Sequence, residues 1–340
     1  MAKILVTGGA GFIGSHTVVA LHEAGHQPII VDDFSNSDIK VLEGISQITG
    51  VSFPFYQIDC NDKNALSKVF ENEKNIEGVI HFAAFKAVGE SVEQPLKYYH
   101  NNVGSLVTLL EIMQVYSVTQ LVFSSSCTVY GNPDELPVSE KTPYQNATSP
   151  YGNTKVICEQ IIKDAAASGQ RINAVLLRYF NPIGAHPSAL IGELPLGVPN
   201  NLVPFITQTA AGWRAQLTVY GNNYNTADGT CIRDYIHVVD LAKAHIAALG
   251  WAEKQRPSVC EAFNIGTGKG NSVMEVIKTF EKVSQTSLNY RIGQRRQGDV
   301  ETIYGNVDKA NQTLNWEAKY SLEEALTHAW KWQNELEEQI

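Results

Sequence analysis

The stretch KILVTGGAGFIGSH, residues 3–16, places a cluster of glycines directly behind a short apolar run. Glycine lets the backbone turn tightly and lets another group approach it closely. Two nucleotide-loop spacings fit: GxGxxG at Gly9, Gly11 and Gly14, and GxxGxxG at Gly8, Gly11 and Gly14. A strand is expected before this loop, and a helix is expected after it, ending at Gly25. This order predicts a diphosphate bound at a helix N-terminus, where free N–H groups and the helix dipole favour an anion.

An acidic pair follows the second predicted strand, with Asp32 at its end and Asp33 beside it. In dinucleotide-binding domains an acid about 20 residues beyond the glycines binds the adenosine ribose. A carboxylate at this place favours NAD, and no arginine stands nearby to bind the 2′-phosphate of NADP. NAD is therefore the predicted cofactor. The alternative, a glycine-rich turn before an unrelated helix, is disfavoured by the combination of strand, spacing and acid.

Short β-branched runs alternate with helix-like segments through the first half of the chain. The predicted strands are Ile4–Val6, Ile29–Val31, Phe53–Ile58, Val79–Phe82, Leu121–Phe123 and Val175–Leu177. Most are apolar throughout, as in parallel sheets that helices cover on both faces. The pattern predicts an α/β fold with a Rossmann-type, doubly wound parallel sheet.

A stretch rich in proline and glycine begins at Asn181 and marks the predicted domain boundary, because neither one helix nor one strand accommodates it. We expect an NAD-binding domain over 1–180, to which the chain returns around 235–250. The remaining segments of 181–340 are expected to form a smaller α/β substrate-binding domain. Its predicted elements are helices near 202–211, 272–283 and 321–336 and a strand over 217–220.

Composition limits the classes of partner. The 340 residues are 44% hydrophobic and 18% charged, with a formal net charge of −9. Without blocks of lysine or arginine, neither a nucleic acid nor an anionic membrane is an expected partner. No apolar stretch reaches the ~18 residues of a transmembrane helix, and the first apolar run meets Gly8 too early for a signal peptide. Five cysteines without a CxxC pair indicate no disulfide framework and no metal site, so we expect a soluble, cytoplasmic protein.

The segment SPYGNTK, residues 149–155, predicts the start of a helix, with Ser149 as its cap and Pro150 in the first position. Tyr151 and Lys155 are four residues apart and therefore share one helix face. A phenol has a pKa of about 10 in water, and an ammonium group and a cationic nicotinamide beside it would favour the phenolate. The pair is predicted to exchange a hydroxyl proton near neutral pH. A solvated helix face is the alternative.

Serines follow an apolar strand in LVFSSSCTVYG, residues 121–131. Ligands of parallel α/β sheets bind at this end of the strands. We therefore expect Ser126 to hydrogen-bond the substrate oxygen that Tyr151 deprotonates. A polar strand exit is the alternative for Ser124, Ser125 and Ser126, and it is retained for Ser125.

Several segments, in order, resemble the extended short-chain dehydrogenase/reductase family: TGGAGFIGSH, HFAAFKAVGES, FSSSCTVYG, SPYGNTK, LRYFNPIGAHPS, PNNLVP, GTCIRDYIHVVDLA and RRQGD. The similarity runs from Lys3 to beyond Asp299 and is greatest to members that epimerise a nucleotide sugar. The resemblance implies reversible interconversion of UDP-glucose and UDP-galactose through a 4-keto sugar on bound NAD, with the UDP-N-acetylhexosamine pair as a further candidate. It also implies a homodimer packed through helices.

The resemblance assigns roles to residues at matching positions. Tyr151 is the acid/base, Ser126 assists the proton transfer, and Lys155 holds the nicotinamide ribose and lowers the pKa of the tyrosine. The NAD site would comprise Gly8, Gly11, Phe12, Ile13, Gly14, Asp32, Asn36, Asp59, Cys60, Phe82, Ala83, Lys86, Asn101, Ser124, Tyr151, Lys155 and Tyr179. The UDP-hexose would contact Lys86, Ser126, Tyr151, Asn181, Asn200, Asn201, Leu202, Thr218, Tyr220, Arg233, Tyr235, Arg296, Asp299 and Ile303. Guanidinium forks suit a diphosphate, and surface ion pairs are the alternative for each arginine.

Two positions depart from the family pattern. Cys127 stands where the family carries alanine, and we interpret it as a small packing residue rather than a catalytic thiol. Ile303 occupies a gate position, where an aromatic residue tends to exclude N-acetylated hexoses and a small residue admits them. Isoleucine is intermediate, so the range of substrates stays open.

Other functions remain as alternatives. One is a UDP-uronic-acid epimerase or another nucleotide-sugar enzyme of the family. A 4,6-dehydratase would carry an acidic pair after the catalytic hydroxyl residue, and Cys127 and Thr128 are not acidic. A non-catalytic NAD sensor is a further alternative, but it has no need of the set Ser126, Tyr151 and Lys155.

Overall fold

The computed structural model describes residues 1–296 and 298–338. Within these ranges, seven strands form one parallel sheet in the order β11-β6-β5-β4-β1-β2-β3. They are β1 (Lys3–Thr7), β2 (Gln27–Asp32), β3 (Phe55–Gln57), β4 (Ile76–His81), β5 (Gln120–Ser126), β6 (Asn173–Tyr179) and β11 (Val259–Ile265). The strand order reverses between β1 and β4, as in a doubly wound Rossmann-type sheet. The predicted fold class and all six predicted strands are confirmed.

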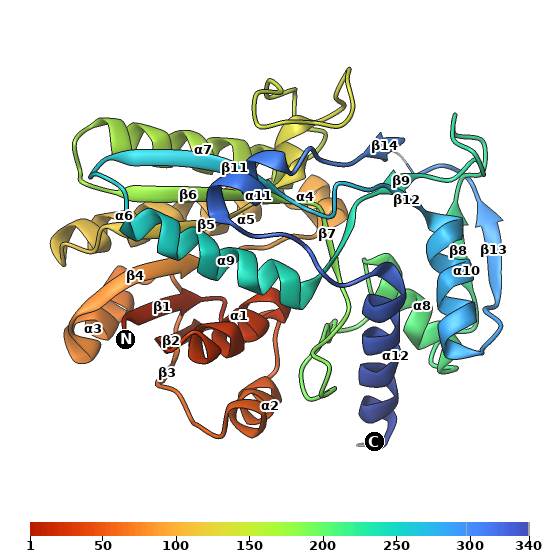
Figure 1. The fold of residues 1–340 in the computed structure, drawn as a ribbon, viewed down its shortest axis with the longest axis horizontal. Coiled ribbons are helices and arrows are strands. Elements are labelled where there is room, and N and C mark those ends of the chain that lie inside the picture. The colour runs from red at the N-terminus through yellow and green to blue at the C-terminus, as the bar shows by residue number, and fades with distance from the viewer. Residues whose placement is uncertain (297, 339–340) are drawn as a thin grey trace.

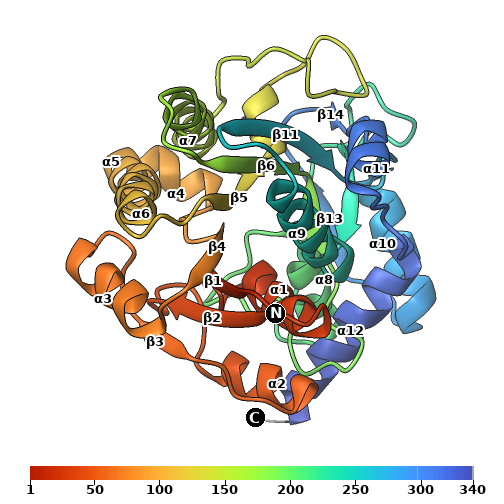
Figure 2. The same cartoon turned by 60° about the vertical axis from the view of Figure 1, so that its left-hand side comes forward.

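Helices cover both faces of this large sheet (Figure 2). One face carries α3 (Lys63–Glu73), α6 (Gly104–Val115) and α7 (Pro150–Ala167), and the other carries α1 (Phe12–Glu23), α2 (Lys40–Thr49), α9 (Val238–Glu253) and α11 (Asp308–Leu314). Successive strand residues point to opposite faces. Ile4 and Val6 therefore pack with α1 and α9, whereas Leu5 packs with α3 and α6. Burial on both faces explains why the strands are apolar throughout.

The seventh strand, β11, was not among the predicted strands. It lies at the edge of the sheet, parallel to β6, and the chain reaches it through α9, which packs against α1. Its sequence, VCEAFNI, includes Glu261 and Asn264 and is only half-buried in its first four residues. An edge strand of this composition lacks the continuous apolar run that marked the other strands.

A second group of elements lies beside the large sheet, on the right in Figure 1. The helices α8 (Leu202–Ala210), α10 (Val273–Ser284) and α12 (Leu322–Glu338) enclose their own apolar cluster, which includes Ile206, Phe280 and Leu326. Against them lies the parallel pair β8 (Leu217–Tyr220) and β13 (Tyr290–Gly293). The helices predicted near 202–211, 272–283 and 321–336 and the strand over 217–220 are confirmed.

Two small sheets of short strands lie between the two groups of elements. β7 (Asn181–Ile183) pairs with β10 (Tyr235–His237), and β9 (Ile232–Arg233) lies between β12 (Asn271–Ser272) and β14 (Thr302–Ile303). The remaining elements are α4 (Val88–Glu93), α5 (Pro95–Tyr98), a π-helical turn at Tyr99–Val103 and a 3₁₀ turn at Cys127–Tyr130. Over the described ranges, no helix has both the length and the apolar character needed to cross a membrane.

Candidate active site

The glycine loop lies where the strand order of the large sheet reverses. The Gly8 N–H donates to the carbonyl of Val31 at 2.7 Å, which folds the loop over the end of β2. A Cβ on Gly14 would lie 2.1 Å from the Gly8 carbonyl oxygen, so only glycine permits α1 to approach the loop this closely. The helix begins at Phe12 and Ile13, and its N-cap, Gly11, has no side chain to occupy the first N–H groups. A diphosphate fits this helix start.

Hydrogen bonds from the glycine loop and from the residues after β2 hold the Asp32 carboxylate at the end of β2. Its carboxylate accepts hydrogen bonds from the N–H of Ala10 at 3.0 Å, the N–H of Phe34 at 3.0 Å and the hydroxyl of Ser37 at 2.8 Å. Burial raises the pKa of Asp32, and these hydrogen bonds oppose the shift. The acid and the glycine loop therefore form one unit.

The other residues predicted to surround the cofactor lie along the same edge of the sheet. Phe82 and Ala83 follow β4 and lie against Gly8, where a Cβ on the glycine would be 2.9 Å from the Ala83 nitrogen. The Asn61 amide donates to Asp59 at 2.9 Å and to Asn101 at 3.3 Å, which brings these two predicted residues together. Two further members are an exposed Asn36 and a buried Cys60.

The three predicted catalytic residues lie together at the carboxyl end of β5. Lys155 Nζ donates to the carbonyl of Ser124 at 2.7 Å, and the Ser124 hydroxyl hydrogen-bonds the Tyr179 hydroxyl. Ser126 ends the same strand. Lys155 Nζ is 6.0 Å from the centre of the Tyr151 ring. Tyr179, which was predicted near the nicotinamide, therefore joins the same cluster.

Local sequence explains why α7 presents this pair. Ser149 caps the helix by accepting from the Gly152 N–H at 3.2 Å, and Pro150 takes the first position, as predicted. The spacing of four then puts Tyr151 and Lys155 on the face that packs against β5. Lys155 is buried, with only 4% of its surface exposed.

Burial dominates the electrostatics of the pair. It raises the pKa of Tyr151 above the usual value, with Tyr179 adding to the shift and the Ser126 hydroxyl opposing it. Burial also lowers the pKa of Lys155 to about 8. The protein by itself therefore favours the neutral phenol, and the phenolate needs positive charge near the ring beyond that of Lys155.

A buried carboxylate that the sequence analysis missed lies one turn beyond Lys155. Glu159 accepts from the hydroxyls of Ser125 and Tyr144, both at 2.5 Å, and from Arg178 Nε at 2.9 Å and Nη2 at 2.6 Å. Ser125, which was predicted to be a polar strand exit, is buried and donates to this carboxylate. The spacing 151, 155, 159 on one helix face is the sequence signal that predicts such a residue.

The predicted substrate residues continue from this cluster along the short strands. The pairing of β7 with β10 sets Asn181 opposite Tyr235, and the pairing of β14 with β9 sets Ile303 opposite Arg233. The charge of Arg233 favours the thiolate of Cys127 and so lowers its pKa, against the larger effect of burial. Ile303 also packs in the same apolar cluster as Cys127, so β14 and β9 lie beside the residue that follows Ser126.

Another part of the predicted substrate site lies over β8. Arg296 pairs with Asp299 at 2.7 Å, and its guanidinium lies 5.7 Å from the centre of the Tyr220 ring. Thr218, on the same strand, accepts from Arg291 Nε at 3.3 Å. The side chain of Arg296 is 58% exposed.

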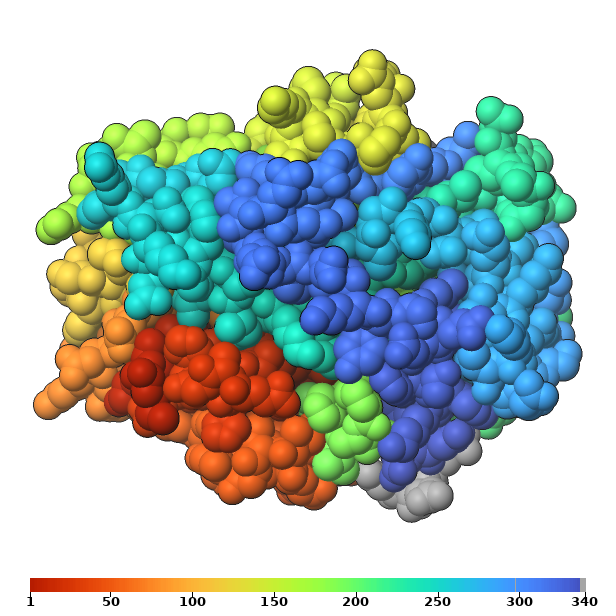
Figure 3. Space-filling view, in the orientation of Figure 1, coloured from red at the N-terminus to blue at the C-terminus, as the bar shows by residue number. Residues whose placement is uncertain are grey.

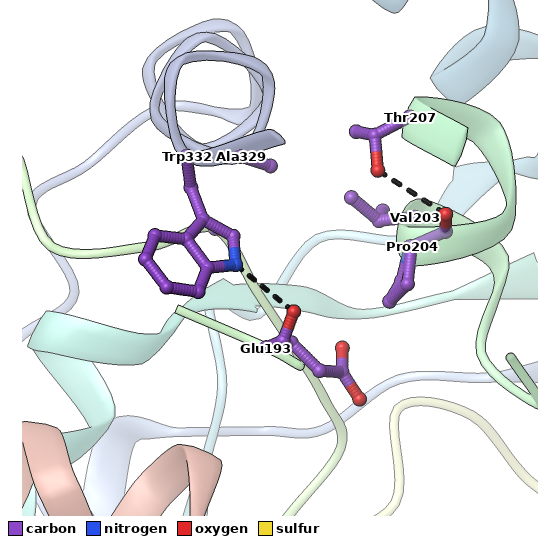
Figure 4. Close-up of a pocket in the computed structure, with 7 residues that line it drawn as sticks. Glu193, Val203, Pro204, Thr207, Ala329 and Trp332 are labelled. Carbon is purple, nitrogen blue, oxygen red and sulfur yellow. Dashed lines mark hydrogen bonds between the residues drawn. The ribbon is translucent and has the colours of Figure 1, made fainter. Parts of the chain in front are cut away.

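Two of the remaining predicted ligand residues, Asn201 and Lys86, contact Glu193, which was not predicted to belong to the site. Asn201, just before Leu202 at the start of α8, donates its amide to Glu193 Oε1 at 2.6 Å. Lys86 Nζ lies 3.4 Å from the same oxygen. The carbonyl of Glu193 accepts from Trp332 Nε1 of α12 at 3.0 Å (Figure 4). Asn200 is exposed beside this group.

The sequence model of a family described as GDP-mannose 4,6 dehydratase matches residues 5–329. The chain is 51% identical over 332 residues to the UDP-glucose 4-epimerase of Bacillus subtilis (strain 168), with 97% of this chain and 96% of that relative covered. This chain belongs to the UDP-glucose 4-epimerase family. The resemblance that its motifs suggested is confirmed.

Solved structures of UDP-glucose 4-epimerases share this fold. The enzyme of Stenotrophomonas maltophila, crystallised with bound NAD and formylated UDP-arabinopyranose, has a TM-score of 0.97 and 45% identity, with 100% of each chain covered. The enzyme of Bifidobacterium longum in complex with NAD+ and UDP has a TM-score of 0.94 and 45% identity, with 98% of each chain covered.

The structure places both positions, Cys127 and Ile303, that were predicted to depart from the family pattern. Burial raises the pKa of the Cys127 thiol to about 12, which suits a packing residue and not a nucleophile. Ile303 is 5% exposed and packs in the same apolar cluster as Cys127 and Phe180. Ile303, which was predicted to be a gate residue, therefore packs with the turn that follows Ser126.

Proposed function

We propose that this protein interconverts UDP-glucose and UDP-galactose by inverting C4 of the hexose, with NAD as its cofactor. The observation that carries this proposal is the joining of Tyr151, Lys155 and Ser126 at the carboxyl end of β5. It occurs in a chain about half identical to UDP-glucose 4-epimerases. A protein that only senses NAD has no use for this set.

The residues present fit NAD. The uncapped start of α1 suits the diphosphate, and Asp32 suits the adenosine ribose. We assign the adenosine end to Asn36, Asp59, Cys60 and Asn101, and the nicotinamide end to Phe82, Ala83, Lys86, Ser124, Lys155 and Tyr179. When bound, NAD supplies the acceptor and donor of the C4 hydride.

The chain's own residues would handle the proton. Tyr151 removes it from the C4 hydroxyl and returns it after the 4-keto sugar has turned in the pocket, and Ser126 hydrogen-bonds the same oxygen. Lys155, held by the Ser124 carbonyl, supplies positive charge beneath the phenol. General acid/base catalysis of this kind contributes about 10²–10⁴ in rate.

The UDP-hexose would lie between the two groups of elements. We assign its diphosphate to Arg233 and Arg296, because guanidinium groups bind phosphate oxygens in pairs. The remaining contacts are assigned to Lys86, Asn181, Asn200, Asn201, Leu202, Thr218, Tyr220, Tyr235, Asp299 and Ile303. Whether the N-acetylated pair is accepted depends in this proposal on the space beside Ile303.

The organisation of the chain follows from these assignments. We propose that 1–180 with α9, β11 and α11 form the NAD-binding domain and that the remaining segments of 181–340 form the nucleotide-sugar domain. We also propose a homodimer, supported by the exposed apolar side chains Val107 and Val115 on α6. Light scattering after size exclusion tests it. Five free cysteines support a reducing, cytoplasmic setting.

The proposed function is tested by incubating the purified protein, without added NAD, separately with UDP-galactose, UDP-N-acetylgalactosamine and UDP-glucuronate, and analysing the sugars by NMR. We expect UDP-galactose to yield UDP-glucose. Reaction of the glucuronate alone would point to a uronic-acid epimerase. No reaction after NAD has been supplied would favour a non-catalytic NAD sensor.

A further inference from the structure

Glu193 joins three elements that are far apart in the sequence. Its carboxylate accepts from the Asn201 amide at 2.6 Å and pairs with Lys86 at 3.4 Å, and its carbonyl accepts from Trp332 Nε1 at 3.0 Å. The side chain of Glu193 is 12% exposed, whereas that of Lys86 is 47% exposed. Glu193 is therefore the mostly buried member of the group, and the lysine is the solvent-exposed one.

The segment that carries Glu193 is clamped on both sides. A Cβ on Gly192 would lie 2.5 Å from the Trp332 ring, and a Cβ on Gly44 of α2 would lie 2.3 Å from the Leu190 carbonyl oxygen. Lys331 Nζ donates to the Pro187 carbonyl at 3.0 Å. Figure 3 shows this segment, in light green, between α2 and α12. The backbone of the segment that carries Glu193 is thus held by α2 and α12.

The hydrogen bond between Asn201 and Glu193 fixes which end of the Asn201 amide faces the carboxylate. A carboxamide has one donor end and one acceptor end, whereas an ionised carboxylate only accepts. Glu193 therefore fixes the NH₂ end of Asn201 toward itself and leaves the oxygen free to accept from a ligand. It also attracts the ammonium of Lys86, which restricts where that long side chain can reach.

We propose that Glu193 is a positioning residue of the UDP-hexose site, which orients Asn201 and Lys86 toward the ligand, and that Trp332 holds Glu193 in place. The inference rests on the proposed function, because Asn201 and Lys86 are ligand contacts only under that proposal. The proposal makes α12 part of the support of the site, through the hydrogen bond from Trp332 to the Glu193 carbonyl. The ion pair is half-exposed and so contributes little to stability.

The first test compares Glu193→Ala and Glu193→Gln with the parent protein. The measurements are kcat and KM for UDP-galactose, the Kd for UDP added to the NAD-loaded protein, and Tm. We expect Glu193→Ala to raise KM and the UDP Kd together by about 10- to 100-fold, the range for losing a hydrogen bond to a charged group, with a much smaller change in kcat. Glu193→Gln keeps an acceptor for Asn201 and should recover part of the UDP affinity.

The second test changes only the hydrogen bond from Trp332 to the Glu193 carbonyl. Trp332→Phe removes the N–H that holds the Glu193 carbonyl while keeping an aromatic ring beside Gly192. Trp330→Phe is the matched control, because Trp330 lies on the same helix but packs against Phe280, with 5.6 Å between the ring centres. We expect Trp332→Phe to raise KM several-fold and Trp330→Phe to leave KM unchanged.

Unchanged KM and UDP Kd in Glu193→Ala would overturn the inference. So would a pattern in which Glu193→Ala and both tryptophan variants lower Tm alike without a change in KM. The UDP titration needs no turnover. A parent protein that binds UDP but leaves UDP-galactose unchanged would therefore refute the proposed function, while weaker UDP binding by Glu193→Ala would still support the role of Glu193.

Discussion

Arg178 and Glu159 form an ion pair that is almost completely withdrawn from solvent, with 2.6 Å between Nη2 and Oε2 and side chains that are 3% and 0% exposed. Ser125 donates to the same carboxylate, between Ser124, which holds Lys155, and Ser126. The pair therefore joins β6, α7 and β5 directly behind the proposed catalytic residues.

Removing one partner of this pair should be costly. Glu159→Gln leaves the Arg178 guanidinium buried without a counter-charge, and breaking a buried pair in this way costs about 3–5 kcal/mol. Ser125→Ala removes one donor and should cost about 1–3 kcal/mol. Unfolding in urea measures both free energies. Equal stability of Glu159→Gln and the parent protein would contradict the argument.

Tyr151→Phe should abolish the proton transfer without disturbing the fold. The substitution removes only the hydroxyl, so we expect a fall in kcat of about 10²–10⁴ or more, with NAD still bound. Turnover is followed by NMR, and NAD is measured after release by denaturation. An unchanged rate would remove Tyr151 from the mechanism.

Gly14→Ala should prevent NAD retention. Its Cβ would lie 2.1 Å from the Gly8 carbonyl oxygen, which forces the loop and α1 apart. Gly250→Ala is a matched control, because a Cβ at Gly250 on α9 would meet no atom of another described element within 4 Å. We expect the control to purify with as much NAD as the parent. Equal NAD content in Gly14→Ala would show that the loop does not hold the diphosphate.

Stability should fall as the pH is lowered from about 6.5 to about 4. Burial lowers the pKa of His16, His81 and His237 to about 3 and that of His245 to about 4. The unfolded chain takes up these protons near pH 6.5 while the folded chain does not, so acid favours unfolding. Urea unfolding at several pH values measures the slope.

A variant of His237 measures how much this one histidine contributes to the pH dependence of the free energy of unfolding. His237 Nδ1 accepts from the Val239 N–H at the start of α9, and asparagine can cap a helix in the same way without titrating. His237→Asn should therefore be less sensitive to acid than the parent protein. The same slope in both proteins would show that His237 does not contribute.

Ile303→Ala should widen the range of sugars. The side chain packs with Cys127 and Phe180, so truncation opens space beside the turn that follows Ser126. We expect the ratio of kcat/KM for UDP-N-acetylgalactosamine to that for UDP-galactose to rise, at a cost in stability of about 2–5 kcal/mol. A constant ratio would mean that Ile303 is no gate.

The sequence predicted the large sheet well because its inner strands are buried on both faces and therefore read as apolar runs. It did not predict β11, which lies at an edge and carries Glu261 and Asn264. The glycine loop and α7 were predictable because their spacing and capping are local. The sequence signals for both lie within a few residues, although the loop is also held by Val31 and Asp32.

The carboxylates of Glu193 and Glu159 were harder to predict, because their hydrogen-bond partners are distant in the sequence. Glu193 meets Lys86 and Trp332 across 107 and 139 residues, and no local spacing connects them. Glu159 is intermediate, since its place after Tyr151 and Lys155 is visible in the sequence but its pairing with Arg178 is not. Long-range pairing between polar residues is what a single sequence conceals.

The late arrival of β11 has a consequence for synthesis on the ribosome. β6 ends at Tyr179, but the strand that covers its edge begins only at Val259. Until that point has been translated, β6 presents unpaired backbone groups to any neighbouring nascent chain. A fragment that stops near residue 180 would lack β11, so the edge of β6 would stay unpaired and would favour association with other chains.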